Sequence, residues 1–160
     1  MRASRPFYVA LRAPALADRR GLRWLLSDRL WPVPVMVLRH RGRRSGRRYA
    51  TPVEAIAESR ERGRVVISPM RGAEGDWYRN LIAGGLVEVG LHGERFEADW
   101  RRLDEGEAAE ATREYLDAHP RYARLVARSL MRLHGLEGDP IAELPRALPM
   151  LELTLRPKEG

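Results

Sequence analysis

The sequence predicts a single α+β domain of mainly β structure, in which an antiparallel sheet or barrel of about six strands carries added helices. The chain has 160 residues, of which 44% are apolar, and this is enough for one core. Its strand-like runs come mostly in sequential pairs and do not alternate regularly with helical segments. Sequential pairing favours an antiparallel arrangement over a doubly wound parallel sheet.

An amphipathic helix is predicted at residues 16–31, ahead of the first strand. Leu22, Leu25, Leu26 and Leu30 recur there at helical spacing, with arginines between them. This pattern fits a helix packed on the domain, and it also fits a helix lying on a membrane surface.

Three strands are predicted in the next part of the chain. The run VPVMVLRH at residues 33–40 is apolar and β-rich, and residues 49–57 are its expected partner. The stretch GRVVISPM at residues 63–70 is the third strand. Residues 72–85 then indicate a loop, a short helix and a glycine stop.

A hairpin of two half-buried strands is predicted at residues 86–91 and 95–102, with His92-Gly93 as its turn. Apolar residues stand at alternate positions in both segments, which is the pattern of a strand with one buried face. The residues expected on that face are Val87, Val89, Leu91, Phe96, Ala98 and Trp100.

A pair of helices is predicted at residues 104–135. Asp104 and Glu107 have the spacing of a capping box, Pro120 stops the first helix, and Gly135 ends the second. A closing strand follows at residues 150–155. The apolar face expected for the second helix consists of Tyr122, Leu125, Val126, Leu130 and Leu133.

Charge is distributed unevenly along the chain, whose formal net charge is +7. The first 50 residues contain 13 arginines against two aspartates, which favours an anionic partner for this part. The chain has no cysteine, so disulfides, thiolate nucleophiles and cysteine metal sites are excluded. The four histidines lack the spacing of metal ligands, and no metal is expected. No apolar run approaches the length of a membrane span, and a cytoplasmic protein is expected.

The most basic stretch is RHRGRRSGRRYATP at residues 39–52, with six arginines within ten residues. Gly42 and Gly46 permit a positive φ that would expose backbone N–H groups, and Ser45 adds a hydroxyl. Guanidinium groups bind phosphate bidentately, so a phosphate cradle is one interpretation. A solvated charged loop is another. Nucleic-acid binding is the least favoured, because Tyr49 alone offers a stacking surface.

Two segments resemble a known family. The segment LRHRGRRSGRRYATPV at 38–53, followed by DWYRNLIAGG at 76–85, is similar to the deazaflavin-dependent nitroreductases of the FMN-binding split-barrel superfamily. This resemblance implies a six-stranded antiparallel split β-barrel with helices at the N-terminus, between strands three and four, and before the last strand. The resemblance runs from about Leu38 to Trp100. The chain is expected to form one domain, residues 1–160, made of the N-terminal helix region 1–31, a barrel core 33–103, the helical pair 104–135 and the closing strand 150–155.

The resemblance also implies the cofactor F420, a deazaflavin whose tail carries phosphate and glutamate groups. Reduced F420 gives a hydride to an electron-poor organic acceptor such as a quinone, an enone or a nitro compound. Tyr78 is the candidate proton donor or substrate-orienting residue. The residues that the resemblance assigns to the cofactor are Arg41, Gly42, Arg43, Arg44, Ser45, Gly46, Arg47, Arg48, Thr51, Pro52, Ser68, Met70, Gly72, Trp77, Asn80 and Leu81.

The main alternative keeps the fold and changes the ligand, to an FMN- or haem-binding protein or a carrier that is not an enzyme. FMN has one phosphate and needs fewer arginines, so the excess of positive charge favours F420. The expected partners are the anionic cofactor, a small-molecule electron acceptor and a second copy of the chain. Residues 16–31 add the hypothesis of weak contact with a membrane surface.

Overall fold

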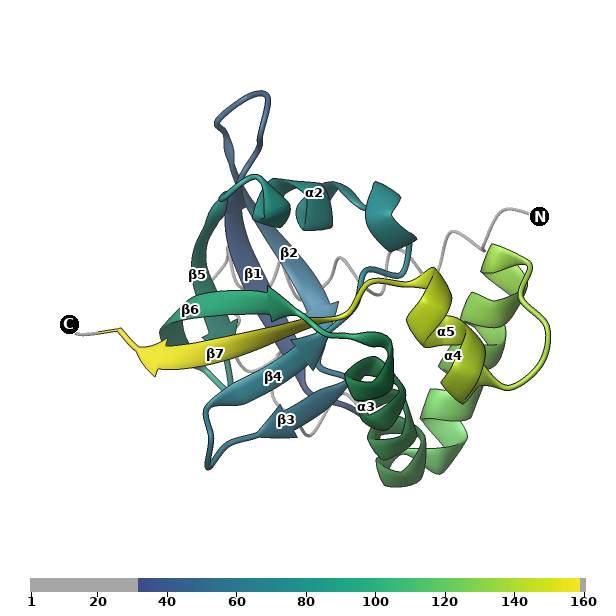
Figure 1. Ribbon diagram of the computed structural model, residues 1–160. Helices are drawn as coiled ribbons and strands as arrows, with labels where there is room; N and C mark the ends of the chain where they lie inside the picture. The colour runs from purple at the N-terminus through teal and green to yellow at the C-terminus, as the bar shows by residue number, and fades with distance from the viewer. Residues whose placement is uncertain (1–31, 159–160) are drawn as a thin grey trace. The chain divides into compact units, whose positions relative to one another are not determined.

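A computed structural model describes residues 32–158, which form two compact units (Figure 1). The described part of the first unit comprises residues 32–54, 76–98 and 155–158, and the second unit comprises residues 55–75 and 99–154. Strands β6 (Glu94–Arg102) and β7 (Leu151–Pro157) each contribute residues to both units. The helix predicted at residues 16–31 lies outside the described residues.

The first unit is a set of antiparallel strands with one helix. Strand β1 (Val35–Arg41) pairs with β2 (Arg48–Glu54) and with β5 (Leu86–Leu91), and β5 pairs with β6. Helix α2 (Asp76–Ile82) lies beside the hairpin that β1 and β2 form (Figure 1). The most deeply buried apolar side chains of these elements are Met36, Leu38, Leu81 and Val89, each with no exposed area.

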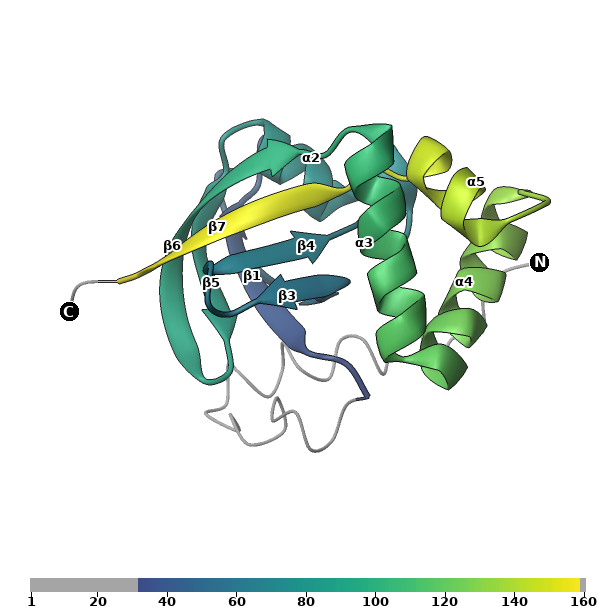
Figure 2. The same cartoon turned by 60° about the horizontal axis from the view of Figure 1, so that its bottom comes forward.

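The second unit combines short strands with helices. Strand β4 (Arg64–Ile67) pairs antiparallel with β3 (Ala57–Ser59) and with β7. The short 3-10 helix η2 (Gly72–Glu74) precedes α3 (Glu105–Ala118), α4 (Pro120–His134) and α5 (Pro140–Ala147). The three α-helices lie side by side (Figure 2). One apolar cluster joins α3 to Val66 and Met150, and another joins α4 to α5.

The strand order is β2-β1-β5-β6-β7-β4-β3. The prediction of an antiparallel sheet with added helices is confirmed, but the predicted count of six strands is wrong, because seven are present in residues 32–158. The additional strand is β3, which has only three residues and therefore shows no readable alternation of apolar side chains. It pairs with β4 across a tight turn.

The local signals of the sequence are confirmed where they depend on neighbouring residues. His92 and Gly93 both have positive φ, 48° and 82°, as a two-residue hairpin turn requires. Asp104 and Glu107 form the predicted capping box at the start of α3. Pro120 begins α4 instead of continuing α3, and Gly135 ends α4 in the left-handed conformation.

The burial predicted for residues 86–91 is wrong at two positions. Val87 is 40% exposed, whereas Glu88 is only 4% exposed. The cause is a bulge in the β1–β5 pairing: Arg39 opposes Glu88, but His40 opposes Leu86, so Val87 is left without a partner. An extra residue in one strand interrupts the two-residue alternation from which the buried face was inferred.

The predicted apolar face of α4 is also partly wrong. Leu125 is 64% exposed and Leu133 is 45% exposed, and the buried face instead uses small residues, Ala123 and Ala127, with Val126 and Met131. Helix α5 was not predicted, because two prolines and a glycine precede or interrupt it. Pro140 stands at its first position, where no N–H is needed, and the Asp139 carboxylate accepts the N–H of Ile141.

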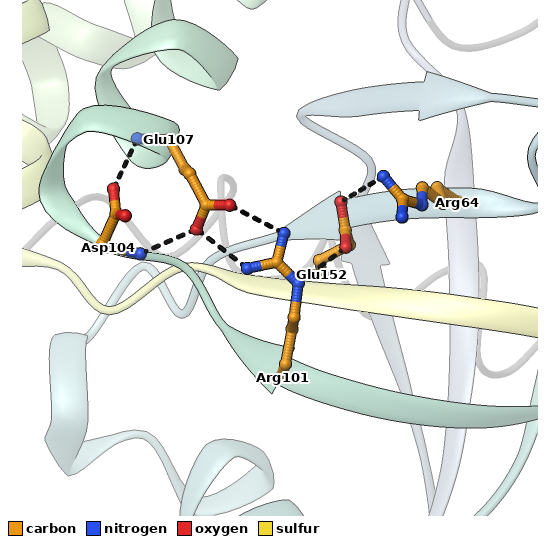
Figure 3. Close-up of polar contacts among 5 residues, drawn as sticks. All are labelled: Arg64, Arg101, Asp104, Glu107 and Glu152. Carbon is orange, nitrogen blue, oxygen red and sulfur yellow. Dashed lines mark hydrogen bonds and ion pairs between the residues drawn. The ribbon is translucent and has the colours of Figure 1, made fainter.

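A network of charged side chains ties the start of α3 to β6 and β7 (Figure 3). The Arg101 guanidinium donates to both carboxylate oxygens of Glu107, at 2.8 and 2.9 Å, and to Glu152 at 2.9 Å. Arg64 lies 3.7 Å from the other Glu152 oxygen. These bonds lower the pKa of Glu107 to about 2, with the Arg101 hydrogen bonds as the largest cause and the Asp104 N–H as the next.

This network predicts acid sensitivity of the second unit. The pKa of Glu107 is near 4.3 in the unfolded chain and about 2 in the fold. Its contribution to stability is therefore present above about pH 4.3 and is lost as the pH falls toward 2. In Glu107→Gln the capping hydrogen bonds can still form, but the charge is gone. We expect the free energy of unfolding of this variant, measured in urea, to fall less between pH 5 and pH 2.5 than that of the wild type; parallel curves would contradict the assignment.

Candidate cofactor-binding site

The turn at residues 42–47 projects beyond the paired ends of β1 and β2 (Figure 1). The Gly42 N–H donates to the Arg47 carbonyl, and the Gly46 N–H donates to the Gly42 carbonyl, each at 2.8 Å. Gly46 has φ +65°, a conformation that other residues seldom adopt. These bonds close the turn into a compact loop.

Several backbone N–H groups of this turn are used by the protein itself. Gly42 does not adopt positive φ, and its N–H group and that of Gly46 are used inside the turn. The Arg47 N–H donates to Ser45 Oγ at 3.3 Å, and the Arg43 N–H donates to Asn80 Oδ1 at 3.1 Å. These four N–H groups are therefore not available to an anion, whereas the exposed guanidinium groups of the stretch are.

The six arginines of the turn and of the strand ends beside it divide into two sets. Arg39 Nε lies 3.6 Å from a buried Glu88 oxygen, and the Arg43 guanidinium lies 3.3 Å from Asp76. The others form no ion pair with any residue of 32–158, and all of them are exposed: Arg41, Arg44, Arg47 and Arg48.

Two arginines of the unpaired set stand directly opposite each other. Arg41 and Arg48 are cross-strand partners in the β1–β2 register. Like charges placed opposite each other in a sheet repel. Because no described carboxylate relieves this repulsion, an anion bound between or above the two side chains would stabilise the hairpin.

Asn80 fastens the turn to helix α2. Its Oδ1 accepts both the backbone N–H of Arg43 and the Arg43 guanidinium, at 3.1 and 3.0 Å. Two donors on Oδ1 leave Nδ2 to face His40, and it donates to His40 Nδ1 at 3.2 Å. Asn80 is only 4% exposed, so these contacts are shielded from water.

Gly85 brings the end of α2 close to β1. Its carbonyl accepts the Arg41 N–H at 2.7 Å, and its own N–H donates to the Asn80 carbonyl at 2.8 Å. A Cβ at this position would lie 2.6 Å from each of the carbonyl oxygens of Arg41 and Asn80. Only glycine permits this approach, which holds Asn80 within reach of the turn.

His40 completes the network beneath the turn. Since Nδ1 accepts from Asn80, the neutral ring carries its proton on Nε2, which donates to Thr51 Oγ1 at 2.9 Å. The ring also stacks on Tyr49, with centroids 5.7 Å apart. Burial lowers the pKa of His40, and protonation at Nδ1 would set an N–H against the Asn80 amide donor.

The lowered pKa of His40 predicts a loss of stability in mild acid. The unfolded chain takes up this proton near pH 6.5, before the folded chain does, so stability falls as the pH drops below about 6.5. His40→Gln keeps an acceptor and a donor but does not titrate. We expect urea unfolding between pH 7.5 and pH 5.5 to show a smaller drop for this variant than for the wild type, and an equal drop would refute the role of His40.

The remaining predicted site residues fall in both units. In the first unit, Thr51 and Pro52 are half-buried on β2, and Trp77 lies edge-on to the buried Tyr78 on α2. In the second unit, Ser68 donates to the Pro149 carbonyl, the Met70 carbonyl is bonded to His134, and the Gly72 N–H donates to Pro69. Among the predicted site residues, Arg43, Thr51 and Asn80 belong to one hydrogen-bonded network, which His40 connects.

Two residues of this network were missed from the sequence. In the sequence, His40 is only one of four histidines without metal-ligand spacing, although it follows the apolar run of β1, where a buried polar side chain is unusual. Asp76, the ion partner of Arg43, gave no signal beyond its place before a helix. Within residues 32–158, no group of three His, Asp or Glu side chains is arranged to hold a metal ion.

Comparison with known proteins identifies the class. The fold is that of two solved structures, each 18% identical to this chain. A structure described as that of an F420-H2 dependent reductase (FDR-A) covers 75% of this chain and 93% of its own, with a TM-score of 0.51. One described as a domain-swapped dimer covers 94% and 99%, with a TM-score of 0.52. Among curated proteins, none matches the sequence.

The class is thus a small α+β fold with an arginine-rich turn. Residues 19–134 match the model of the family described as F420H(2)-dependent quinone reductase, and the chain belongs to this family. It is an oxidoreductase, and F420 is its cofactor. No helix in the described part of the chain is long and apolar enough to cross a membrane.

Proposed function

We propose that this protein transfers a hydride from reduced F420 to a quinone, and that the turn at residues 42–47 binds the anionic tail of the cofactor. The observation that carries the residue assignment is the set of four exposed arginines, Arg41, Arg44, Arg47 and Arg48, without a carboxylate partner in residues 32–158. Phosphate and glutamate groups are the anions that guanidinium forks bind most readily.

Other exposed arginines of the chain provide a comparison that supports the turn as the anion site. Arg101, Arg113 and Arg146 are also exposed, but each is paired with one or more carboxylates. Exposure alone therefore does not leave an arginine of this chain unpaired. The turn concentrates unpaired charge at one place, as an electrostatic site for a polyanion does.

The network beneath the turn positions it for binding. Asn80 orients Arg43, and His40 links Asn80 to Thr51, so the turn is fastened to α2 and β2 before a ligand arrives. Preorganised donors lose little conformational freedom on binding. Thr51, Pro52, Trp77, Asn80 and Leu81 remain our candidates for contacts with the ring and ribityl part of the cofactor. Contacts from Ser68, Met70 and Gly72 stay a prediction.

When bound, reduced F420 supplies the hydride, and the acceptor also needs a proton. We assign the proton to Tyr78, a phenol only 7% exposed on the same helix as Asn80. Tyr78→Phe is expected to lower kcat by roughly tenfold or more, within the range for loss of a general acid, and to leave the affinity for F420 unchanged. An unchanged kcat with a soluble quinone would show that Tyr78 does not donate the proton.

The test of the proposed function is oxidation of reduced F420 under anaerobic conditions. The purified chain is mixed with reduced F420 and a soluble quinone, and the return of F420 absorbance is followed. We expect one F420 to form for each quinone reduced, at a rate proportional to enzyme concentration. Tight F420 binding with no quinone-dependent oxidation would make the protein a carrier or a reductase of another acceptor, such as a nitro compound or an enone.

An FMN titration tests the alternative ligand. Intrinsic tryptophan fluorescence reports binding of either cofactor, since Trp77 lies on α2 beside the network. We expect F420 to bind more tightly than FMN, which carries a single phosphate. The resemblance further supports two proposals: a split β-barrel of the FMN-binding type, and a homodimer, for which the domain-swapped neighbour is a precedent in the same fold.

A further inference from the structure

The inward face of helix α4 is fully used in packing. Ala127 and Met131 join Leu144 of α5 and Leu148, the residue after α5, in one buried cluster, and Ala123 has no exposed area. This packing accounts for the small and apolar residues on that side of the helix. It does not account for the other side.

The outward face of α4 carries two exposed leucines. Leu125 is 64% exposed and Leu133 is 45% exposed. They lie eight residues apart, which places them about two turns apart on neighbouring parts of one face. Exposure of large apolar side chains on one helix face is a mark of an interaction surface when it is combined with a second feature.

The second feature is charge. Four exposed arginines form the adjoining strip of the outward side, at spacings of three and four residues, with Leu125 beside them and Leu133 nearer the buried side. None of the four forms an ion pair with a described residue: Arg121, Arg124, Arg128 and Arg132. Helix α4 contains no acidic residue. The adjacent helix α3 differs, because its Arg113 is paired with Glu110.

We propose that this face of α4, defined by the four arginines and the two leucines, binds the surface of an anionic lipid bilayer. Arginine side chains contact lipid phosphates, while leucine side chains enter the boundary between headgroups and acyl chains. Both kinds of side chain then have a partner at the same time. An apolar quinone partitions into a bilayer, so binding there would bring the enzyme to its proposed acceptor, although the surface itself does not depend on F420 binding.

The geometry favours a surface over a single ion. Arg121 and Arg132 are separated by about 16 Å along the helix axis at 1.5 Å per residue. One phosphate cannot contact both, but a layer of headgroups can. A single-stranded nucleic acid would be expected to use aromatic side chains among the arginines, and the exposed apolar side chains here are leucines.

Co-sedimentation of the full chain with vesicles tests the proposal. One set of vesicles contains phosphatidylcholine with phosphatidylglycerol, and the other contains phosphatidylcholine alone. We expect binding to the anionic vesicles that weakens with salt, and little binding to the neutral ones. Absence of binding to anionic vesicles at low salt would overturn the proposal.

Two variants and a matched control locate the surface. Arg124→Gln/Arg128→Gln/Arg132→Gln is expected to weaken partitioning by roughly a hundredfold, at about fivefold for each arginine. Leu125→Ser/Leu133→Ser removes the apolar contact and keeps the charge, and it is expected to weaken partitioning several-fold. The control, Arg44→Gln/Arg47→Gln/Arg48→Gln, loses the same charge from the turn at residues 42–47 and the first residue of β2, and it is expected to bind vesicles nearly as the wild type does.

Three outcomes would overturn the assignment to α4. Equal losses in the two arginine triples would indicate attraction by net charge alone. If the α4 triple binds vesicles as tightly as the wild type, the contact lies elsewhere in the chain. Residues 16–31 would then be a candidate, because every variant retains them. Binding of a fluorescent duplex DNA that the α4 triple abolishes, without vesicle binding by the wild type, would make this a nucleic-acid surface. The affinity for F420 is measured separately on the same proteins, so failure of the membrane proposal and failure of the proposed function can be told apart.

Discussion

Replacing Arg44, Arg47 and Arg48 together by glutamine is expected to weaken F420 binding by roughly thirtyfold, which corresponds to about 2 kcal/mol. Each exposed ion contact contributes roughly 0.5–1 kcal/mol, and three are removed. The side chains are exposed and have no ion partner in residues 32–158, so the folded state loses no ion pair. A fluorescence titration of wild type and variant with F420 measures the change.

The matched control for this triple is Arg124→Gln/Arg128→Gln/Arg132→Gln on α4. It removes the same charge from another exposed helix face, and its affinity for F420 should stay within about twofold, since long-range effects are screened at physiological salt. Raising the salt concentration should weaken F420 binding to the wild type more than to the turn triple. Equal loss of affinity in both triples would mean that net charge, and not the turn, attracts the cofactor.

Asn80→Ala is expected to have the largest effect on stability among the polar residues of the site. It removes the acceptor of two Arg43 donors and the donor to His40 Nδ1. The Arg43 backbone N–H and His40 Nδ1 then lose their partner, whereas the Arg43 guanidinium keeps Asp76. An unsatisfied buried polar group costs roughly 1–3 kcal/mol. We therefore expect a loss of about 2–3 kcal/mol, which is a fall in Tm of roughly 5–10 °C.

Ile82→Ala serves as the comparison on the same helix. Ile82 is 46% exposed, so its loss should cost less than about 1 kcal/mol. F420 binding to folded Asn80→Ala should also be weaker, because Arg43 and the turn lose their anchor. If Asn80→Ala unfolds at the same urea concentration as Ile82→Ala, the network does not stabilise the turn in the way described.

Features that depend on adjacent residues could be predicted from the sequence. The capping box of Asp104 and Glu107, the His92-Gly93 turn and the left-handed Gly135 each follow from chemistry within four residues. Features set by long-range pairing could not. The bulge at Val87 depends on how β5 aligns with β1, and nothing in residues 86–91 records that alignment.

The candidate site shows the same division. The resemblance pointed to the turn and to Asn80 but not to the contact between Asn80 and His40, which are 40 residues apart in the chain. Which arginines remain unpaired depends on where Glu88 and Asp76 lie, and composition carries no such information. The exposure of Leu125 and Leu133 likewise results from the inward packing of Ala123 and Ala127, which the spacing of apolar residues in α4 does not indicate.

The most direct test of the account compares F420 with the deazaflavin riboside that lacks its phosphate and glutamate tail. Affinities of both ligands are measured for the wild type and for the Arg44, Arg47 and Arg48 triple, which completes a double-change cycle. The account predicts that the wild type binds F420 far more tightly than the riboside, and that the triple reduces this difference by roughly thirtyfold, the loss expected for F420. An undiminished preference for F420 in the triple would contradict the assignment of the tail to this turn.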